Sequence, residues 1–384
     1  MDKMASNQKF SNQRLKEVAL LFLKLGTISF GGPAAHIAMM KEEVVKKRQW
    51  IDEQHFLDLI GATNLIPGPN STEMAIHIGH ERAGWKGLIV AGLCFIVPAV
   101  IITGIFAVLY KEYGHLPIVQ PFIYGISPAI IAIILSAVYP LAKKSIKTIE
   151  LGLIGIISFI LCLCGFNEIY VMFGAGLIAL ALTLIRLRKI NTLNSAFPLA
   201  ILQFTGNGFF NLRNLGIFLT FLKIGAILYG SGYVLFAFLD TELVAKGIIS
   251  RQQLVDAIAV GQFTPGPVFS SVTFIGYQIN YFTGALIATL GIFLPSFLFV
   301  ALLNPLVRKM RNSKSFSAFL DAVNVASVAI IAVICYQLGK ETISDWRTVL
   351  IAILSLTVVF GFRRINSALV VIGGSGLGFL LTLL

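Results

Sequence analysis

The 384-residue chain has few charged residues, 12% of the total against 57% hydrophobic residues. Soluble globular proteins carry roughly 25% charged residues. The composition therefore excludes a cytosolic enzyme or a nucleic-acid-binding protein and predicts a polytopic membrane protein, with the lipid bilayer as its partner. The formal net charge of +12 then indicates cytoplasmic-loop bias first, and attraction of an anionic substrate second.

Other features are missing as well. The polar residues 1–13 contain no apolar core before a small-residue cleavage site, so we expect no removable signal peptide. No phosphate-loop motif and no catalytic constellation occur, which argues against an ATP-driven pump, an enzyme or a bound cofactor. The four cysteines lie in apolar runs without the spacing of a metal or redox pair, and we expect free thiols and no metal site: Cys94, Cys162, Cys164 and Cys335.

Long apolar runs predict about ten transmembrane helices, since a helix needs about 20 residues to cross a ~30 Å hydrocarbon core. The runs lie near residues 17–40, 87–110, 118–140, 149–166, 169–185, 215–239, 283–306, 316–338, 347–362 and 365–384. Two further stretches, 56–80 and 254–281, carry Pro-Gly-Pro at their centres. A straight helix would not tolerate these tripeptides, so we expect two re-entrant helical hairpins.

The chain is a tandem duplication. Phe22-Leu23-Lys24 recurs as Phe221-Leu222-Lys223 at an offset of 199, and residues 67–69 recur as 265–267 at an offset of 198. Such self-similarity indicates repeated structural units. We place the first repeat at 14–188 and the second at 213–384, joined by a connector at 189–212 and preceded by the polar segment 1–13.

Basic residues in equivalent loops indicate that the two repeats face opposite ways. The loop 41–48 carries four basic residues and its counterpart 240–247 carries one, whereas 111–115 carries one and its counterpart 308–314 carries four. Because lysine and arginine mark the cytoplasmic side, this contrast predicts inverted-topology repeats with five spans each. The side on which the N-terminus lies stays open, since Lys3, Lys9, Arg14 and Lys16 would then fall outside.

Broken helices in inverted repeats are typical of secondary transporters that bind substrate near the membrane midplane. Irregular backbone at that depth is tolerated where it lines a cavity or is buried in protein. The expected breaks are two glycine-rich kinks and the two Pro-Gly-Pro tips: Gly31, Gly32 and Pro33; Gly230 and Gly232; Pro67, Gly68 and Pro69; Pro265, Gly266 and Pro267.

Each tip is a candidate anion site. Pro69 and Pro267 suit the first position of a helix, so the following backbone N–H groups would point out of a helix end that favours anions. The polar residues that would add donors are Asn70, Ser71 and Thr72 in the first tip, and Ser270 and Ser271 in the second. The alternative is that each tripeptide is only a tight turn between packed helices.

Lys24 and Lys223 occupy the same place in the two repeats, within apolar surroundings just before the glycine kinks. A lysine inside a span is expensive and is by default a candidate for function. We therefore expect both lysines to bind substrate, with snorkelling to the interface as the alternative.

Four other groups could carry a proton. Asp58 and Asp256 are equivalent; they could cap a hairpin helix, pair with the lysines, or titrate, and capping or pairing is favoured. Glu73 and His77 share one helical face, and the second repeat has no titratable group at their positions. Burial would move such groups toward titration near neutrality, although a satisfied polar pair explains them equally well.

The linked motifs of the first repeat closely resemble those of the chromate ion transporter family: SFGGPAAHI at 29–37, WIDE at 50–53, Pro-Gly-Pro at 67–69 and RAG at 82–84. The second repeat is similar to the family's second repeat at GSGY, 230–233, and GQFTPGPV, 261–268. The resemblance covers nearly the whole chain. It implies a two-repeat transporter of a bacterial or archaeal inner membrane that confers chromate resistance by efflux.

The resemblance also brings in two further tip residues. The family commonly has glutamine where Asn64 stands, while Gln262 keeps it in the second repeat, so the two tips need not act equally. Chromate is nearly isosteric with sulfate, and uptake of sulfate or another oxyanion by proton symport is the alternative function. A non-transporting membrane scaffold is the alternative of another class, and a homodimer is left open.

Overall fold

The computed structural model describes residues 2–30, 32–186, 213–230, 232–311, 313–362 and 365–383, and every regular element in these ranges is a helix. The first repeat contains α1 (Asp2–Ile28), α2 (Gly32–Lys41), the π-helix η1 (Glu42–Lys47), α3 (Glu53–Thr63), α4 (Asn70–Tyr113), α5 (Gln120–Ser145), α6 (Ile149–Leu163) and α7 (Glu168–Arg186). The second contains α8 (Arg213–Ile227), α9 (Val234–Leu239), the π-helix η2 (Asp240–Val244), α10 (Arg251–Phe263), the 3-10 turn η3 (Val268–Ser270), α11 (Ser271–Arg311), α12 (Lys314–Thr342), α13 (Trp346–Gly361) and α14 (Ser367–Thr382). The expected connector lies outside the described residues.

The predicted all-α membrane fold is confirmed. Five helices are long and apolar enough to cross a membrane: α4, α5, α7, α11 and α12. Four shorter apolar helices, α6, α8, α13 and α14, accompany them. α1, which is apolar only after Glu17, brings the number of such helices to five in each repeat, in line with the predicted number of about ten. The protein is thus a multi-pass membrane protein.

The apolar run at 17–40 is not one continuous helix. α1 ends at Ile28, and the chain resumes as α2 at Gly32, whose φ of 78° lies in the left-handed region. Glycine adopts that region without steric cost, and Pro33 then suits the first turn of a helix. Of the expected kink residues, Gly31 lies outside the described residues.

Both Pro-Gly-Pro segments are the tips of helical hairpins. α3 leads into the first tip and the start of α4 leads out, while α10 and α11 do the same in the second repeat. At 44 residues, a straight α4 would be about 66 Å long, roughly twice the hydrocarbon core. It is broken at Ala83 and Gly84, and α11 is broken at the equivalent Asn280 and Tyr281, so each hairpin returns before the spanning part begins.

Equivalent helices of the two repeats begin with equivalent caps. The Asp52 carboxylate accepts the His55 N–H at the start of α3, and Ser250 with Gln253 forms a capping box at the start of α10. These side chains satisfy N–H groups that the helix itself leaves free. The duplicated sequence therefore sets the same helix starts twice.

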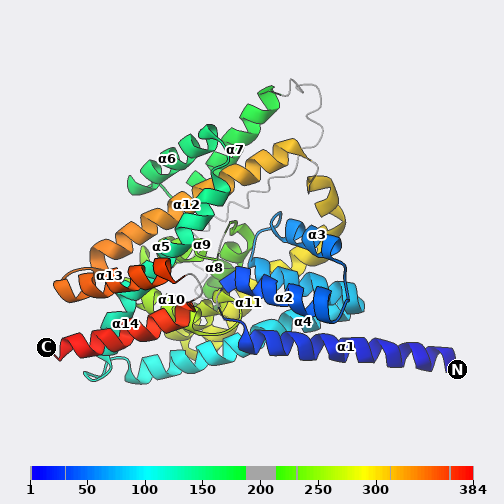
Figure 1. Ribbon diagram of the computed structural model, residues 1–384, viewed down its shortest axis with the longest axis horizontal. Helices are drawn as coiled ribbons and strands as arrows, with labels where there is room; N and C mark the ends of the chain where they lie inside the picture. The colour runs from blue at the N-terminus through cyan, green and yellow to red at the C-terminus, as the bar shows by residue number, and fades with distance from the viewer. Residues whose placement is uncertain are drawn as a thin grey trace.

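The repeats are interlocked and not side by side. α1 packs on α4, α8 packs on α11, and α4 packs on α11 between them. The last two helices of each repeat cross over: α6 and α7 lie along α12, while α13 and α14 lie along α5 (Figure 1). These crossings are reciprocal between the two repeats, as a twofold relation requires.

Glycines allow the closest of these crossings. A Cβ at Gly26 on α1 would lie 2.6 Å from the Phe95 oxygen on α4, and a Cβ at the equivalent Gly225 on α8 would lie 2.4 Å from the Ile292 oxygen on α11. In a bilayer, helices associate mainly through such close packing of small residues. The same contact therefore joins the first two long helices of both repeats.

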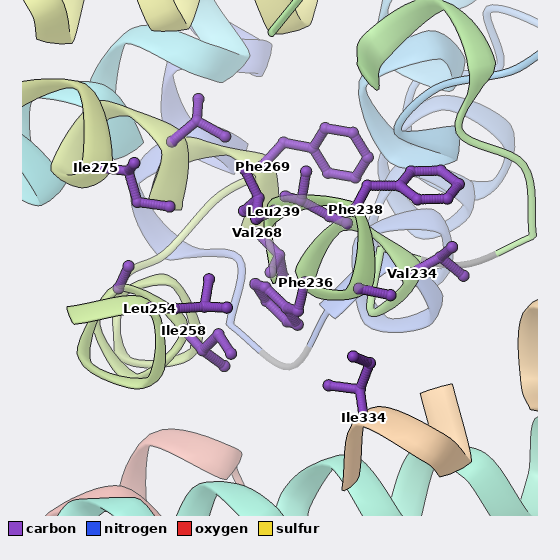
Figure 2. Packing of buried hydrophobic residues seen from close by; sticks show 14 of the residues in the cluster. Val234, Phe236, Phe238, Leu239, Leu254, Ile258, Val268, Phe269, Ile275 and Ile334 are labelled. Carbon is purple, nitrogen blue, oxygen red and sulfur yellow. The ribbon is translucent and has the colours of Figure 1, made fainter. Parts of the chain in front are cut away.

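The large apolar core is centred on the second repeat. Figure 2 shows side chains of α9 gathered with those of α10, the second tip and α12, among them Phe236, Leu254, Val268 and Ile334. The corresponding elements of the first repeat, α2 and α3, pack in smaller separate clusters. α10 is supported by α5 and α14, whereas α3 rests on α4 and α11. The two hairpins share a backbone plan but differ in their surroundings.

Gly225→Ala tests the α8–α11 crossing. The added methyl group meets backbone that cannot move aside, so we expect a loss of about 1–3 kcal/mol and a lower Tm in detergent. Gly216→Ala on the same helix is the matched control, because a Cβ there meets nothing within 4 Å. Equal Tm values for the two variants would contradict this packing.

Candidate functional site

Each hairpin tip is held by the broken helix of the opposite repeat. The Gly68 N–H donates to the Leu228 oxygen at 2.8 Å, and the Gly266 N–H donates to the Ser29 oxygen at 2.8 Å. Leu228 and Ser29 directly follow α8 and α1, where each of these helices breaks. His36 Nε2 also lies 3.2 Å from the Ser29 oxygen. The two kinds of break singled out in the sequence thus meet, each with its partner from the other repeat.

Only glycine fits the centre of either tip. Gly68 has φ 136° and Gly266 has φ 86°, both in the region that disfavours a side chain. A Cβ at Gly68 would lie 2.3 Å from Glu73 Oε1 and 2.6 Å from Ser296 Oγ, and one at Gly266 would lie 2.9 Å from Ala99 Cβ. The tips are therefore in close contact with the long helices α4 and α11.

The returning helices begin one residue later than expected, because Pro69 and Pro267 are the N-cap residues and not the first helical ones. In the first tip, the Thr72 and Glu73 N–H groups donate to the Pro69 oxygen. The N–H groups of Asn70 and Ser71 therefore form the free end of α4. The expected helix start is present, and its first turn is short of acceptors.

Several buried polar atoms without a hydrogen-bond partner lie at the tips and kinks, and these belong to Ser29, Thr72, Glu73, Gln262, Ser271 and Ser296. Other such atoms among the described residues belong to His36, His77, Arg82 and Arg347. Leaving a buried polar group unpaired costs about 1–3 kcal/mol. Such a concentration is typical of a place that binds something from outside the chain, which agrees with a functional role for the tips.

The remaining tip residues are paired. Asn70 Nδ2 donates to Asn64 Oδ1 at 2.9 Å across the first hairpin, and Thr103 Oγ1 donates to Ser270 Oγ at 3.2 Å in the second. Ser71 is buried in the first turn of α4. The tips therefore differ. A hydrogen bond between two amide side chains spans the first hairpin, while the Nε2 of Gln262, which is equivalent to Asn64, is unpaired.

Both candidate lysines are ion-paired to glutamates that the sequence reasoning missed. Lys24 Nζ lies 3.0 Å from Glu43 Oε1, and Lys223 Nζ lies 2.6 Å from Glu242 Oε1. The lysine side chains are 52% and 44% exposed, whereas the glutamates are 10% and 7% exposed. We call these pairs the two lysine–glutamate clasps. Each joins the end of α1 or α8 to the following π-helix, and no described contact brings either lysine onto a tip.

The spacing could have revealed the clasps, since 19 residues separate the partners in both repeats. A second lysine, Lys47 or Lys246, also reaches each glutamate from the next turn. The hydrogen bond from Lys24 lowers the pKa of Glu43. Burial raises the pKa of Glu242, but the hydrogen bonds from Lys223 and Lys246 outweigh it and the net pKa is lowered. Both glutamates are therefore ionised at neutral pH, and the clasps weaken only as the pH falls into the acidic range.

The candidate proton carriers have contrasting environments. Asp256 is buried and accepts from Tyr110 at 2.6 Å and Gln252 at 3.0 Å, so hydrogen bonds to neighbours take the place of a lysine partner. Asp58 is half-buried and lies 3.5 Å from the Gln54 amide. Glu73 and His77 are both buried, and neither has a hydrogen-bond partner for its titratable atoms.

The kink glycines of the second repeat lie against neighbouring helices. Gly230 has φ 97°, and a Cβ there would lie 3.0 Å from the Ser327 side chain on α12. The Gly232 position faces the Phe269 ring of the second tip. These contacts link the second kink to both α12 and its own hairpin.

Comparison with known proteins gives one family for both halves of the chain. The family model described as "Chromate transporter" matches residues 16–180 and again 215–379. A chromate transport protein of Cupriavidus metallidurans is 30% identical over 95% of this chain and 92% of its own length. A probable chromate transport protein of Synechococcus elongatus is 31% identical over 89% of each chain, and an uncharacterized transporter of Methanocaldococcus jannaschii is 26% identical over 99% and 97%. No solved structure matches.

The second clasp can be tested by comparing a single and a double substitution. Lys223→Met leaves the buried Glu242 with Lys246 alone, and we expect a loss of about 1 kcal/mol in detergent because Lys223 is half exposed. Adding Glu242→Gln removes the charge that was left under-compensated, so the double variant should regain part of that loss. Thermal unfolding of the wild type, the single variants Lys223→Met and Glu242→Gln, and the double variant measures this coupling. Additive losses would mean that the two side chains do not interact.

Proposed function

This chain belongs to the chromate transporter family, and on that premise we propose that it is a secondary active transporter that exports a tetrahedral oxyanion, chromate above all. Export of chromate would confer chromate resistance on the cell. The observation that carries the proposal is the pair of hairpin tips, each anchored on the opposite repeat and each lined by buried donors without partners.

The oxyanion would bind where the hairpins meet the opposite repeat. The first tip offers the N–H groups of Asn70 and Ser71 at a helix end that favours negative charge. The hydroxyls of Thr72 and Ser271 are buried and unpaired, so an oxyanion would satisfy both. Ser270, Asn64 and Gln262 complete the proposed donor set. Because each tip is hydrogen-bonded to a kink of the other repeat, the affinity of a tip for the anion would also depend on the relative position of the two repeats.

The two lysines would bind the oxyanion by leaving their glutamate partners. Lys24 and Lys223 are held by Glu43 and Glu242, and Lys47 or Lys246 remains to neutralise each glutamate when its lysine leaves. An approaching dianion competes for the lysine with a carboxylate that has a second cation in reserve. This arrangement makes release of a lysine toward substrate less costly than breaking an isolated pair.

Membrane voltage favours export. Moving one charge through 100 mV changes the free energy by about 2.3 kcal/mol. A dianion that leaves a cell whose interior potential is roughly −150 mV therefore releases about 7 kcal/mol of free energy. Voltage-driven uptake would need more than two co-transported cations. Export by a secondary mechanism therefore requires no nucleotide hydrolysis.

Chromate and sulfate flux in proteoliposomes, with voltage and pH gradients imposed separately, tests the proposal. We expect chromate to move toward the positive side. Sulfate flux that exceeds chromate flux would assign the protein to the alternative oxyanion, and no flux of either anion would favour a scaffold.

Lys24→Ala and Lys223→Ala should each abolish chromate flux, because each removes a cation from the proposed path of the anion. Lys47→Ala and Lys246→Ala are matched controls: each removes a second lysine from the same glutamate, while Glu43 also keeps Arg48, and both should retain most of the flux. Radiolabelled chromate flux, normalised to protein in the vesicles, measures the difference. Equal flux in all four variants would remove the lysines from the substrate path.

A further inference from the structure

One buried carboxyl group in the first tip has no ion-pair partner among the described residues. Glu73 lies in the first turn of α4, is completely buried, and neither of its carboxylate oxygens has a hydrogen-bond partner. No lysine or arginine of the described residues forms an ion pair with it. A charged carboxylate without a partner is strongly unfavourable in such a place, so the group is stable there only as the neutral acid.

A serine of the other repeat faces the same point. Ser296 on α11 is fully buried, and its hydroxyl also lacks a partner. A Cβ built on Gly68 would lie 2.3 Å from Glu73 Oε1 and 2.6 Å from Ser296 Oγ, so both oxygens converge on the centre of the tip. The carboxyl group comes from the first repeat and the hydroxyl from the second, on the two sides of the interface that Gly68 bridges to Leu228.

The second tip has the same backbone without the carboxyl group. Ser271 stands where the first repeat has Glu73, and Ala99 stands where the second repeat has Ser296. A Cβ at Gly266 would meet Ala99 Cβ at 2.9 Å, so the equivalent point faces a methyl group. The pair of repeats therefore contains one such acidic site and not two.

Few other ionisable groups face Glu73. Tyr229, which follows the Leu228 anchor, interacts with it electrostatically. His77 is one turn further along α4, with both ring nitrogens unpaired. No ion pair of the described residues reaches this point, so the charge of Glu73 would be set chiefly by whether water or an anion is present at the tip.

We propose that Glu73 and Ser296 form a single proton-binding site, shared by the two repeats, that takes up one proton together with each oxyanion. The inference rests on the proposed function. The carboxylate takes a proton from water when the tip is open, and the resulting acid keeps it while the tip is closed and returns it to water on the other side. Because the oxyanion would bind on the same helix turn, a charged carboxylate repels it and a neutral acid does not, so proton and anion bind cooperatively.

The single site also agrees with export. A dianion that moves with one proton still carries one net negative charge, so the membrane voltage continues to favour its exit. Two or more such sites would cancel or reverse that driving force. Because Ser271 replaces Glu73 in the second repeat, at most one proton would move with each anion, and transport would still be directed outward.

The test compares Glu73→Gln with wild-type protein in chromate binding and chromate exchange across a pH series in which chromate stays a dianion. Above the midpoint, the wild-type Kd should rise about tenfold per pH unit, as linkage to one proton requires. Glu73→Gln imitates the neutral acid, so its Kd should be low and independent of pH. It should retain chromate exchange but lose chromate accumulation driven by a pH gradient.

Matched variants separate a proton site from a structural role. His77→Gln, on the same helix, should keep the wild-type pH response. Ser296→Ala should shift the pH midpoint, and Ser296→Thr should restore it. If Glu73→Gln does not fold, Glu73→Asp keeps the acid but withdraws it from Ser296, and it should also shift the midpoint.

Infrared spectroscopy supplies a readout that needs no transport. The wild-type protein should show the carbonyl band of a protonated carboxylic acid at neutral pH, and Glu73→Gln should lack it. A pH response or infrared band that survives Glu73→Gln unchanged would overturn the proton site. A band that depends on Glu73, in a protein that moves no chromate, would overturn the proposed function and leave the site in place.

Discussion

Two backbone hydrogen bonds connect the hairpin tips to the helix breaks, one from the Gly68 N–H to the Leu228 oxygen and one from the Gly266 N–H to the Ser29 oxygen. Each joins a hairpin tip of one repeat to the point where the first long helix of the other repeat breaks. A break in a helix leaves carbonyl groups without intrahelical partners, and within a bilayer these must be satisfied by protein. The tips meet part of that need, so neither repeat can place its own kink without the other.

The same dependence explains the interlocked helices. α6 and α7 pack on α12, and α13 and α14 pack on α5, so the scaffold around each tip also comes from both repeats. A motion that separates the repeats must break one tip hydrogen bond or carry the kink along with the tip. Because the packing is reciprocal, the fold has two equivalent places where such a motion can begin, as alternating access in inverted repeats requires.

Much of this arrangement could be predicted from the sequence, because repeats, proline and glycine act locally. Matching motifs at offsets of 197 to 199 indicate the duplication. Single residues such as Gly68 and Gly266 indicate the hairpin tips, and glycines also indicate the kinks. What could not be predicted is which surface each tip meets. Ser296 and Leu228 lie more than 150 positions from the first tip in the chain, and nothing in their local sequence indicates a contact with it. The pairing of the lysines with Glu43 and Glu242 could have been predicted, since the two glutamates repeat at the same offset as Lys24 and Lys223.

The duplication preserved the framework and let the chemistry diverge, and this difference indicates where function is divided. Both tips keep glycine, proline and the opposite carbonyl, and both clasps keep lysine and glutamate. In the proposed mechanism, these shared features would support a motion that both repeats undergo. Glu73 occurs once, and a proton carrier in each repeat would cancel the net charge of the transported dianion, so that the membrane voltage would no longer drive it outward. A symmetric frame with one asymmetric acid is therefore the arrangement expected of an anion exporter that moves at most one proton in each cycle.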